Sequence, residues 1–98
     1  MSVAIQIPTP LRRFTDEKGE VTVQAATVGE AMKALVETYD ALRPHLYTEE
    51  GNLRSFVNLF KNDEDVRFLE REGTPLQDGD QLTIIPSIAG GAAREGRR

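Results

Sequence analysis

Four stretches of the chain predict β-strands. Apolar and polar residues alternate in the first two, with the period of two that is typical of half-buried strands, and the last two carry apolar residues on both faces. Pro8 closes the first stretch, and a polar turn that contains Gly19 separates it from the second, so these two predict a hairpin with a long connection. A shorter apolar run at 66–69 predicts a further strand after a tight polar turn at 62–65. The four stretches are 3–7 (VAIQI), 21–25 (VTVQA), 53–62 (LRSFVNLFKN) and 81–86 (QLTIIP).

Between the second and third stretches, the apolar residues follow the period of a helix. Thr27 and Glu30 stand in the T-x-x-E spacing of a capping box, whose side chains accept free backbone N–H groups at a helix start. An apolar stripe follows and predicts the core-facing side of this helix. We expect one more short turn at 40–46, stopped by Pro44. The stripe consists of Val28, Ala31, Met32, Leu35, Val36 and Tyr39.

The predicted order of elements is β-β-α-β-β-β, and this order indicates the fold class α+β, with a mixed sheet and one main helix packed on one face. In the best-known arrangement of this order, the β-grasp or ubiquitin-like architecture, the last strand lies parallel to the first in the middle of the sheet. We therefore expect a β-grasp domain at 1–89 and a flexible C-terminal tail at 90–98.

The alternation also divides the sheet residues between two faces. We expect the helix to cover the face that holds Val57, Leu59, Leu82 and Ile84. The opposite face keeps two phenylalanines and an isoleucine, which a monomer rarely exposes together, so it is a candidate docking surface for partner proteins. The candidate docking residues are Phe56, Phe60, Thr83 and Ile85.

Composition and charge exclude several classes of function. The 98 residues carry a formal net charge of −4, but the last seven (AAREGRR) carry +2 and leave −6 on residues 1–91. An acidic body repels nucleic-acid phosphates. The chain contains no long apolar run for a membrane span, no signal-peptide pattern and no cysteine, so we expect a cytoplasmic protein without disulfides.

Side chains for catalysis or metal binding are scarce. His45 is the only histidine and there is no thiolate, so zinc sites and nucleophilic triads lack their parts. The acidic turn at 62–65 lacks the oxygen spacing of a calcium loop. Gly29 stands alone at the helix start, without a phosphate-binding glycine pattern. We therefore expect no catalytic residue, no bound metal or cofactor, and a protein that is not itself an enzyme.

The end of the chain is its most informative stretch. After the last predicted strand, Ile88 and Ala89 lead to Gly90 and Gly91. Glycine has no side chain, so this pair can thread extended through a narrow channel in which a partner's active site reaches the carbonyl group of Gly91. The position of the pair directly after the last strand of a β-grasp favours a functional terminus.

The chain resembles the prokaryotic ubiquitin-like sulfur carriers: the small subunit of molybdopterin synthase, the thiamine-pathway carrier and the carrier that serves cysteine synthesis. The resemblance covers residues 1–91 and rests on VAIQIPTPLR (3–12), FVNLFKNDEDVRF (56–68) and LQDGDQLTIIPSIAGG (76–91). The first two stretches are closest to the cysteine-synthesis carrier. Most relatives end at Gly-Gly, and some are made with extra terminal residues that a protease removes.

The resemblance implies chemistry at the carboxyl group of Gly91. An adenylyltransferase and sulfurtransferase of the ubiquitin-activating type would use ATP and magnesium to form an acyl-adenylate, and sulfur would replace AMP to give a thiocarboxylate. A PLP-dependent cysteine synthase would accept the sulfur, and a zinc metalloprotease of the JAMM type would release the cysteine. The same protease class would cut between Gly91 and Ala92 and so remove residues 92–98.

Alternative functions stay open. The sulfur of such a carrier also serves molybdopterin or thiamine synthesis in the wider family. The Gly91 carboxyl group also suits conjugation to a target lysine, as in a ubiquitin-like protein modifier. A simple interaction module with an inert tail predicts instead that Gly91 is replaceable at no cost.

Overall fold

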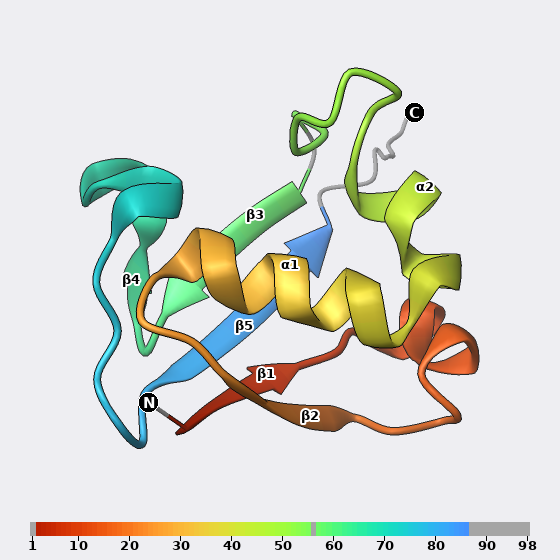
Figure 1. The fold of residues 1–98 in the computed structure, drawn as a ribbon, viewed down its shortest axis with the longest axis horizontal. Helices are drawn as coiled ribbons and strands as arrows, with labels where there is room; N and C mark the ends of the chain where they lie inside the picture. The colour runs from red at the N-terminus through yellow and green to blue at the C-terminus, as the bar shows by residue number, and fades with distance from the viewer. Residues whose placement is uncertain (1, 56, 87–98) are drawn as a thin grey trace, which may run out of the picture.

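The computed structural model describes residues 2–55 and 57–86. Their strands form a five-stranded mixed sheet in the order β2-β1-β5-β3-β4 (Figure 1). β5 lies in the middle, parallel to β1 and antiparallel to β3, which confirms the predicted place of the last strand beside the first. The strands are β1 (Ser2–Gln6), β2 (Glu20–Gln24), β3 (Val57–Lys61), β4 (Glu64–Asp65) and β5 (Gln81–Pro86).

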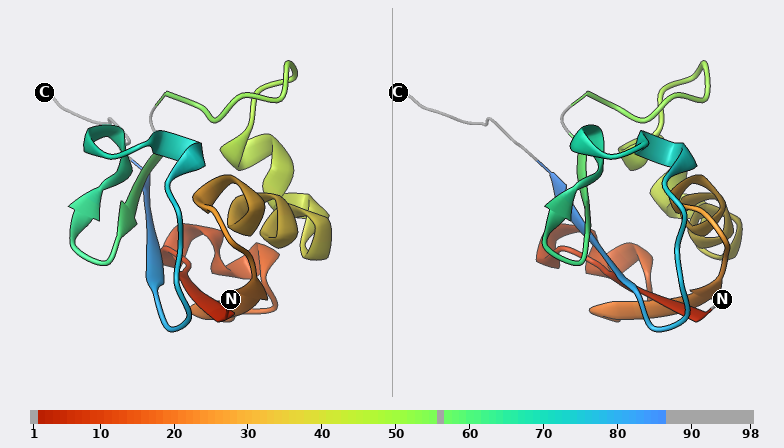
Figure 2. Two further views of the ribbon diagram at one scale, coloured as in Figure 1. Left: turned by 60° about the vertical axis from the view of Figure 1, so that its left-hand side comes forward. Right: turned by 90° about the vertical axis from the view of Figure 1, so that its left-hand side faces the viewer.

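The helices of the described residues lie mainly on one side of this sheet, where α1 crosses it and α2 follows at the end of α1 (Figures 1 and 2). The hairpin between β1 and β2 forms as predicted, but its connection contains the short helix η1 as well as a turn. The buried Thr15 hydroxyl donates to the carbonyl oxygen of Lys18 at 2.9 Å and closes that turn. The helices are α1 (Val28–Thr38) and α2 (Arg43–Leu46), with 3-10 helices η1 (Thr9–Phe14), η2 (Asp40–Leu42), η3 (Val66–Phe68) and η4 (Arg71–Gly73).

The predicted capping box forms at the start of α1, with one change of partner. The Thr27 hydroxyl accepts the backbone N–H of Glu30 at 3.2 Å. The Glu30 carboxylate accepts the N–H of Ala26 at 3.0 Å, one residue earlier than in the standard box. A Cβ atom at Gly29 would lie 3.1 Å from the carbonyl oxygen of Glu72, so glycine here lets the first turn pack closely on η4.

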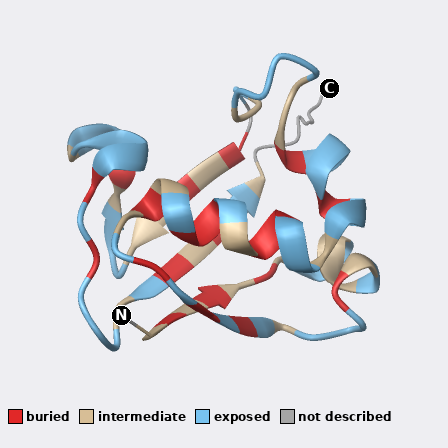
Figure 3. Ribbon diagram, viewed as in Figure 1, coloured by how far each residue is buried: buried red, intermediate tan, exposed pale blue. Residues whose placement is uncertain are grey.

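The hydrophobic core lies between α1 and the sheet face beneath it (Figure 3). All of the predicted helix stripe is buried except Tyr39, which is half-buried at the end of the helix. The inward residues predicted for β1, β2 and β5 are buried as well. Leu42 and Leu46, from η2 and α2, close one end of this core. Its largest fully buried hydrophobic side chains include Ile5, Ile7, Met32, Leu35, Leu42, Leu46, Leu59 and Leu82.

The region after β3 departs from the prediction, because the run at 66–69 contains η3 and no strand. Asn62 has a left-handed φ of 55°, so the chain reverses tightly and β4 begins inside the predicted polar turn. The Asp65 carboxylate then accepts the backbone N–H of Arg67 at 2.9 Å and caps the start of η3. A local side-chain cap therefore prevails over the apolar run.

Two further boundaries also differ from the prediction. Pro44 does not stop the segment after α1, since it lies in the first turn of α2, where a proline loses no hydrogen bond. β3 begins at Val57 instead of residue 53. Arg54 donates its backbone N–H to the carbonyl oxygen of Leu46 at 2.9 Å, so this part of the chain packs on α2.

Candidate functional site

The candidate site is built around β5, which leads from the middle of the sheet to the end of the chain (Figure 1). Pro86 is the last residue of this strand. The predicted adenylation site Gly91, the channel residue Gly90 and the processing bond to Ala92 lie outside the described residues. What the structure describes is the strand that leads toward them and the surfaces on either side of that strand.

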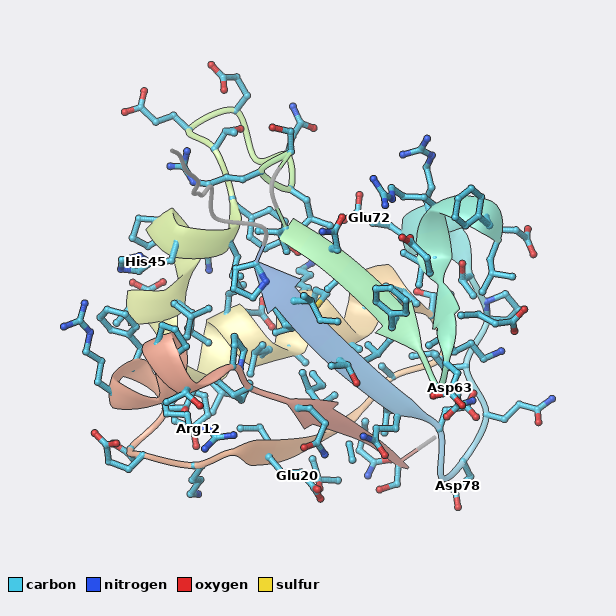
Figure 4. All side chains as sticks on the ribbon, turned by 180° about the vertical axis from the view of Figure 1, so that it is seen from behind. Arg12, Glu20, His45, Asp63, Glu72 and Asp78 are labelled. Carbon is cyan, nitrogen blue, oxygen red and sulfur yellow. The ribbon has the colours of Figure 1, made fainter. Side chains whose placement is uncertain are left out.

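The DGD turn fixes the start of β5 against β1. Gly79 has a φ of 90°, which favours glycine, and its N–H donates to the carbonyl oxygen of Ser2 at 2.8 Å. The carboxylate of Asp78, labelled in Figure 4, accepts the N–H of Ser2 at 2.8 Å. The N–H of Ala4 donates to the carbonyl oxygen of Asp80 at 3.1 Å. These contacts set the register of the two parallel central strands.

The turn between β3 and β4 holds the same end of β5 from the other side. Asn62 donates its backbone N–H to the carbonyl oxygen of Gln81 at 2.7 Å, and its side-chain oxygen accepts the Gln81 N–H at 3.2 Å. The Asp80 carboxylate accepts the N–H of Gln77 at 2.8 Å and lies 3.8 Å from Lys61 Nζ. The hydrogen bond from Gln77, with smaller help from Asn62 and Lys61, lowers the pKa of Asp80 below its ordinary value of 3.8.

The sheet face away from α1 carries the three predicted docking residues that the structure describes (Figure 4 views this side). Thr83 pairs with Gln6 of β1 on one side and with Phe60 of β3 on the other. Ile85 is 44% exposed, while Phe60 and Thr83 are half-buried. Apolar surface from two neighbouring strands therefore reaches solvent on this face. Phe56, the fourth predicted residue, lies outside the described residues.

Phe68 is an exposed aromatic residue that the sequence prediction missed. It ends η3 and is 83% exposed. The short helix is held by Arg67, whose Nη2 atom lies 2.7 Å from Oδ2 of Asp65. The hydrogen bonds from the Arg67 side chain are the main cause that lowers the pKa of Asp65. The available signal was the capping pattern of an aspartate two residues before an arginine, which the prediction of a strand obscured.

Other candidate side chains do not meet in one site within the part of the chain that is described. His45 is exposed, and its ring stacks on Phe14 with centroids 4.3 Å apart. Residues 2–55 and 57–86 contain no group of three His, Cys, Asp or Glu side chains that suits a metal ion. None of the helices in these ranges is long and apolar enough to cross a membrane.

Comparison with known proteins gives the family. The model of the ThiS family matches residues 5–91, which include every strand except the first residues of β1. The chain belongs to the ThiS family. This membership and the order of the sheet confirm the predicted β-grasp fold and place the chain among the ubiquitin-like sulfur carriers.

Two known proteins and one solved structure resemble the chain over two thirds or more of its length. The sulfur carrier protein CysO of Mycobacterium tuberculosis is 39% identical over 93 residues, covering 93% of this chain and 100% of that protein. Small archaeal modifier protein 3 of Haloferax volcanii is 39% identical over 66 residues, covering 67% of this chain and 71% of that protein. A chain in the crystal structure of the Amycolatopsis orientalis BexX/CysO complex aligns with a TM-score of 0.81 at 39% identity, covering 91% of this chain and 99% of that chain. The two named relatives are, by their names, a sulfur carrier protein and a modifier protein.

Proposed function

We propose that the chain carries sulfur as a thiocarboxylate on Gly91 after removal of residues 92–98, and that it donates this sulfur for cysteine biosynthesis. The observation that carries the proposal is the end of the ThiS-family match at residue 91, the second glycine, seven residues before the end of the sequence. The similarity to CysO, which the chain covers over its full length, supports the cysteine branch.

Removal of the tail is necessary for this chemistry. In the full chain the Gly91 carbonyl group belongs to the amide bond with Ala92, so no carboxylate oxygen is free to attack ATP. After cleavage, an activating enzyme of the ubiquitin-activating type uses ATP and magnesium to form an acyl-adenylate and releases pyrophosphate. A sulfur donor then displaces AMP and leaves the thiocarboxylate.

In that reaction, this chain contributes by positioning its glycine pair for the activating enzyme. The DGD turn and Asn62 hold the start of β5 by backbone and side-chain hydrogen bonds, which fix the strand between β1 and β3. Gly90 and Gly91 present no Cβ atoms to the walls of a narrow channel. Phe60, Thr83 and Ile85, together with Phe56, supply the surface on which the activating enzyme or the synthase docks.

In the cysteine branch, a PLP-dependent synthase supplies an aminoacrylate, to which the thiocarboxylate sulfur adds. An acyl shift then gives an amide between Gly91 and cysteine, and a JAMM-type zinc metalloprotease hydrolyses this amide. The same protease class suits the bond between Gly91 and Ala92, because both substrates present the same glycine on the carbonyl side. Sulfur transfer to molybdopterin or thiamine precursors is the alternative within the carrier class.

A second candidate function is protein modification, in which Gly91 is joined to a lysine of a target protein. The 39% identity to small archaeal modifier protein 3 favours it. Intact-mass analysis of the chain from its native cell separates the possibilities, because the thiocarboxylate, the Gly91–cysteine adduct and a lysine conjugate differ in mass. A Gly91–cysteine adduct supports the cysteine branch, and lysine conjugates alone would replace it.

The precursor hypothesis is tested with three proteins, each incubated with the activating enzyme and ATP. They are the full chain, a version that ends at Gly91, and the same truncation with Gly91→Ala. We expect efficient release of pyrophosphate from the unmutated truncation alone, since only it presents a glycine carboxylate. Equal turnover by full chain that mass spectrometry shows to be uncleaved would contradict the proposal.

A further inference from the structure

A hollow of about 320 Å³ opens on the surface where β5 ends. Leu46 and Val57 are its buried apolar residues, and Leu11 and Pro44 line it from η1 and α2. Pro86, the last residue of β5, lines it as well. A cavity of about 150 Å³ is enough to hold a benzene-sized apolar group, so this hollow has room for an aliphatic side chain.

The alternation of β5 shows on which side of the strand the hollow lies. Leu82 and Ile84 face the core, and Pro86 lies on the same side of the strand, because successive side chains of a strand point to opposite faces. Two residues further, the same period leads to Ile88. This is the only apolar side chain larger than alanine in residues 87–98.

The pairing of β3 with β5 indicates the same place. Val57 pairs with Pro86 as the last pair of the antiparallel ladder between β3 and β5. Before Val57 the chain turns, since the N–H of Val57 donates to the carbonyl oxygen of Arg54 at 3.0 Å, and Arg54 lines the hollow. The last pair of the ladder therefore lies at the edge of the hollow.

We propose that this hollow is the docking site for Ile88 of the same chain. Docking there sets the point from which Gly90 and Gly91 leave the surface. Only two residues lie between Ile88 and Gly91, and the three steps span an extended length of roughly 10 Å, so the terminus is presented on a short tether. The docking itself is independent of the chemistry at Gly91, and only its value for presentation rests on the proposed function.

The rest of the tail is a poor occupant of this site. Arg94, Arg97 and Arg98 carry positive charge. The polar residues in the lining of the hollow are Arg54 and His45. Burying a further guanidinium against an apolar wall and a like charge is unfavourable. The site therefore selects the aliphatic side chain that lies closest to Pro86.

The test uses the full chain with ¹³C-labelled isoleucine methyl groups, and nuclear Overhauser effects between methyl groups and neighbouring protons. The variant Ile88→Ser assigns the Ile88 signal by its loss. We expect cross-peaks from the Ile88 methyl groups to protons of Leu11, Pro44 or Leu46, and we expect these three residues to shift in Ile88→Ser. An unchanged Ile84 methyl signal verifies that the core is intact in the variant.

The matched control moves the isoleucine by one position, in the double variant Ile88→Ser and Ala89→Ile. This keeps the composition of the segment but places the side chain on the opposite face of an extended chain, so the signals of the hollow should stay as in Ile88→Ser. Three results would overturn the proposal: Ile88 cross-peaks only to its sequence neighbours, cross-peaks to Ile85 or Phe60 instead, or shifts in the hollow only after the activating enzyme is added. The pyrophosphate assay does not enter this test, so its failure would leave the docking result standing.

Discussion

The two faces of the sheet are made by neighbouring residues of the same strands, yet they have opposite environments. On β5, Leu82 and Ile84 are 0% and 2% exposed, whereas Ile85, the next residue, is 44% exposed. On β3, Leu59 is buried and Phe60 is half-buried. The cause is α1, which covers one face and leaves the other open (Figures 2 and 3).

Because of this difference, neighbouring residues of one strand are expected to have different roles: one stabilises the fold, and the next is available for binding. A side chain on the covered face contributes by being removed from water, at about 25 cal/mol per Å² of apolar surface. A side chain on the open face keeps much of its apolar surface exposed. It therefore contributes less to folding, and this surface stays available for contact with another protein. We therefore expect substitutions on the open face to leave the core intact.

The largest effect that follows from the comparison is on stability. We expect Leu82→Ala to lower the free energy of unfolding by about 2–5 kcal/mol, because it removes a fully buried side chain and leaves a cavity. Thr83→Ala is the matched control on the next residue and opposite face, with an expected loss below about 1 kcal/mol. Urea unfolding of both variants measures the difference. Equal losses would show that the two faces do not differ in the way described.

The second effect is on binding. Ile85→Asp and Phe60→Ala should each weaken binding to the activating enzyme or the synthase by about tenfold or more, as expected when an apolar anchor is lost. Calorimetric titration measures the affinity, and the thermal unfolding of each variant verifies the fold.

The control for this binding experiment is Thr22→Asp, which adds the same charge to the same face but on the edge strand β2. It should leave the affinity nearly unchanged. Unchanged affinity in both test variants would remove the open face from the docking model. A large loss of thermal stability would mean instead that Ile85 and Phe60 belong to the core.

Where the period of the apolar residues reflects burial, the sequence was enough to predict the structure. The alternation in β1, β2 and β5 and the stripe on α1 assigned the buried residues and the open face, and their order led to the fold. The glycine pair and the stretches at 56–68 and 76–91 led to the family. These features are readable because each depends on spacing within a short segment.

Features that depend on contacts between distant residues could not be predicted in this way. Asp78 holds Ser2, and the two residues are 76 positions apart in the chain. The exposure of Phe68 follows from the cap that Asp65 provides, which competes with a strand for the same residues. The local cap and the strand are alternatives of similar free energy, and the period of apolar residues does not show which of the two is more stable.

The smallest effect concerns the polar contacts at the ends of the strands. It compares these contacts with the covered face through the pH dependence of the free energy of unfolding. The aliphatic covered face has no proton to gain, so acid sensitivity is expected from carboxylates such as Asp80, whose folded pKa is lowered. A lowered pKa means that the unfolded state binds protons first. The contribution of Asp80 is therefore complete above its ordinary pKa of 3.8 and is lost as the pH falls through the folded value.

We expect the free energy of unfolding, measured by urea titration between pH 7 and pH 2.5, to fall below about pH 4, and to fall less steeply in Asp80→Asn. The effect is small because the asparagine oxygen still accepts the N–H of Gln77, so that the variant loses the charge and keeps the hydrogen bond. Asp63→Asn, in the neighbouring turn, changes the net charge equally and serves as the control. If both variants follow the same pH dependence, the contacts of Asp80 add nothing beyond net charge. A steeper fall in Asp63→Asn than in Asp80→Asn locates the acid-sensitive stability at the start of β5, outside the covered face.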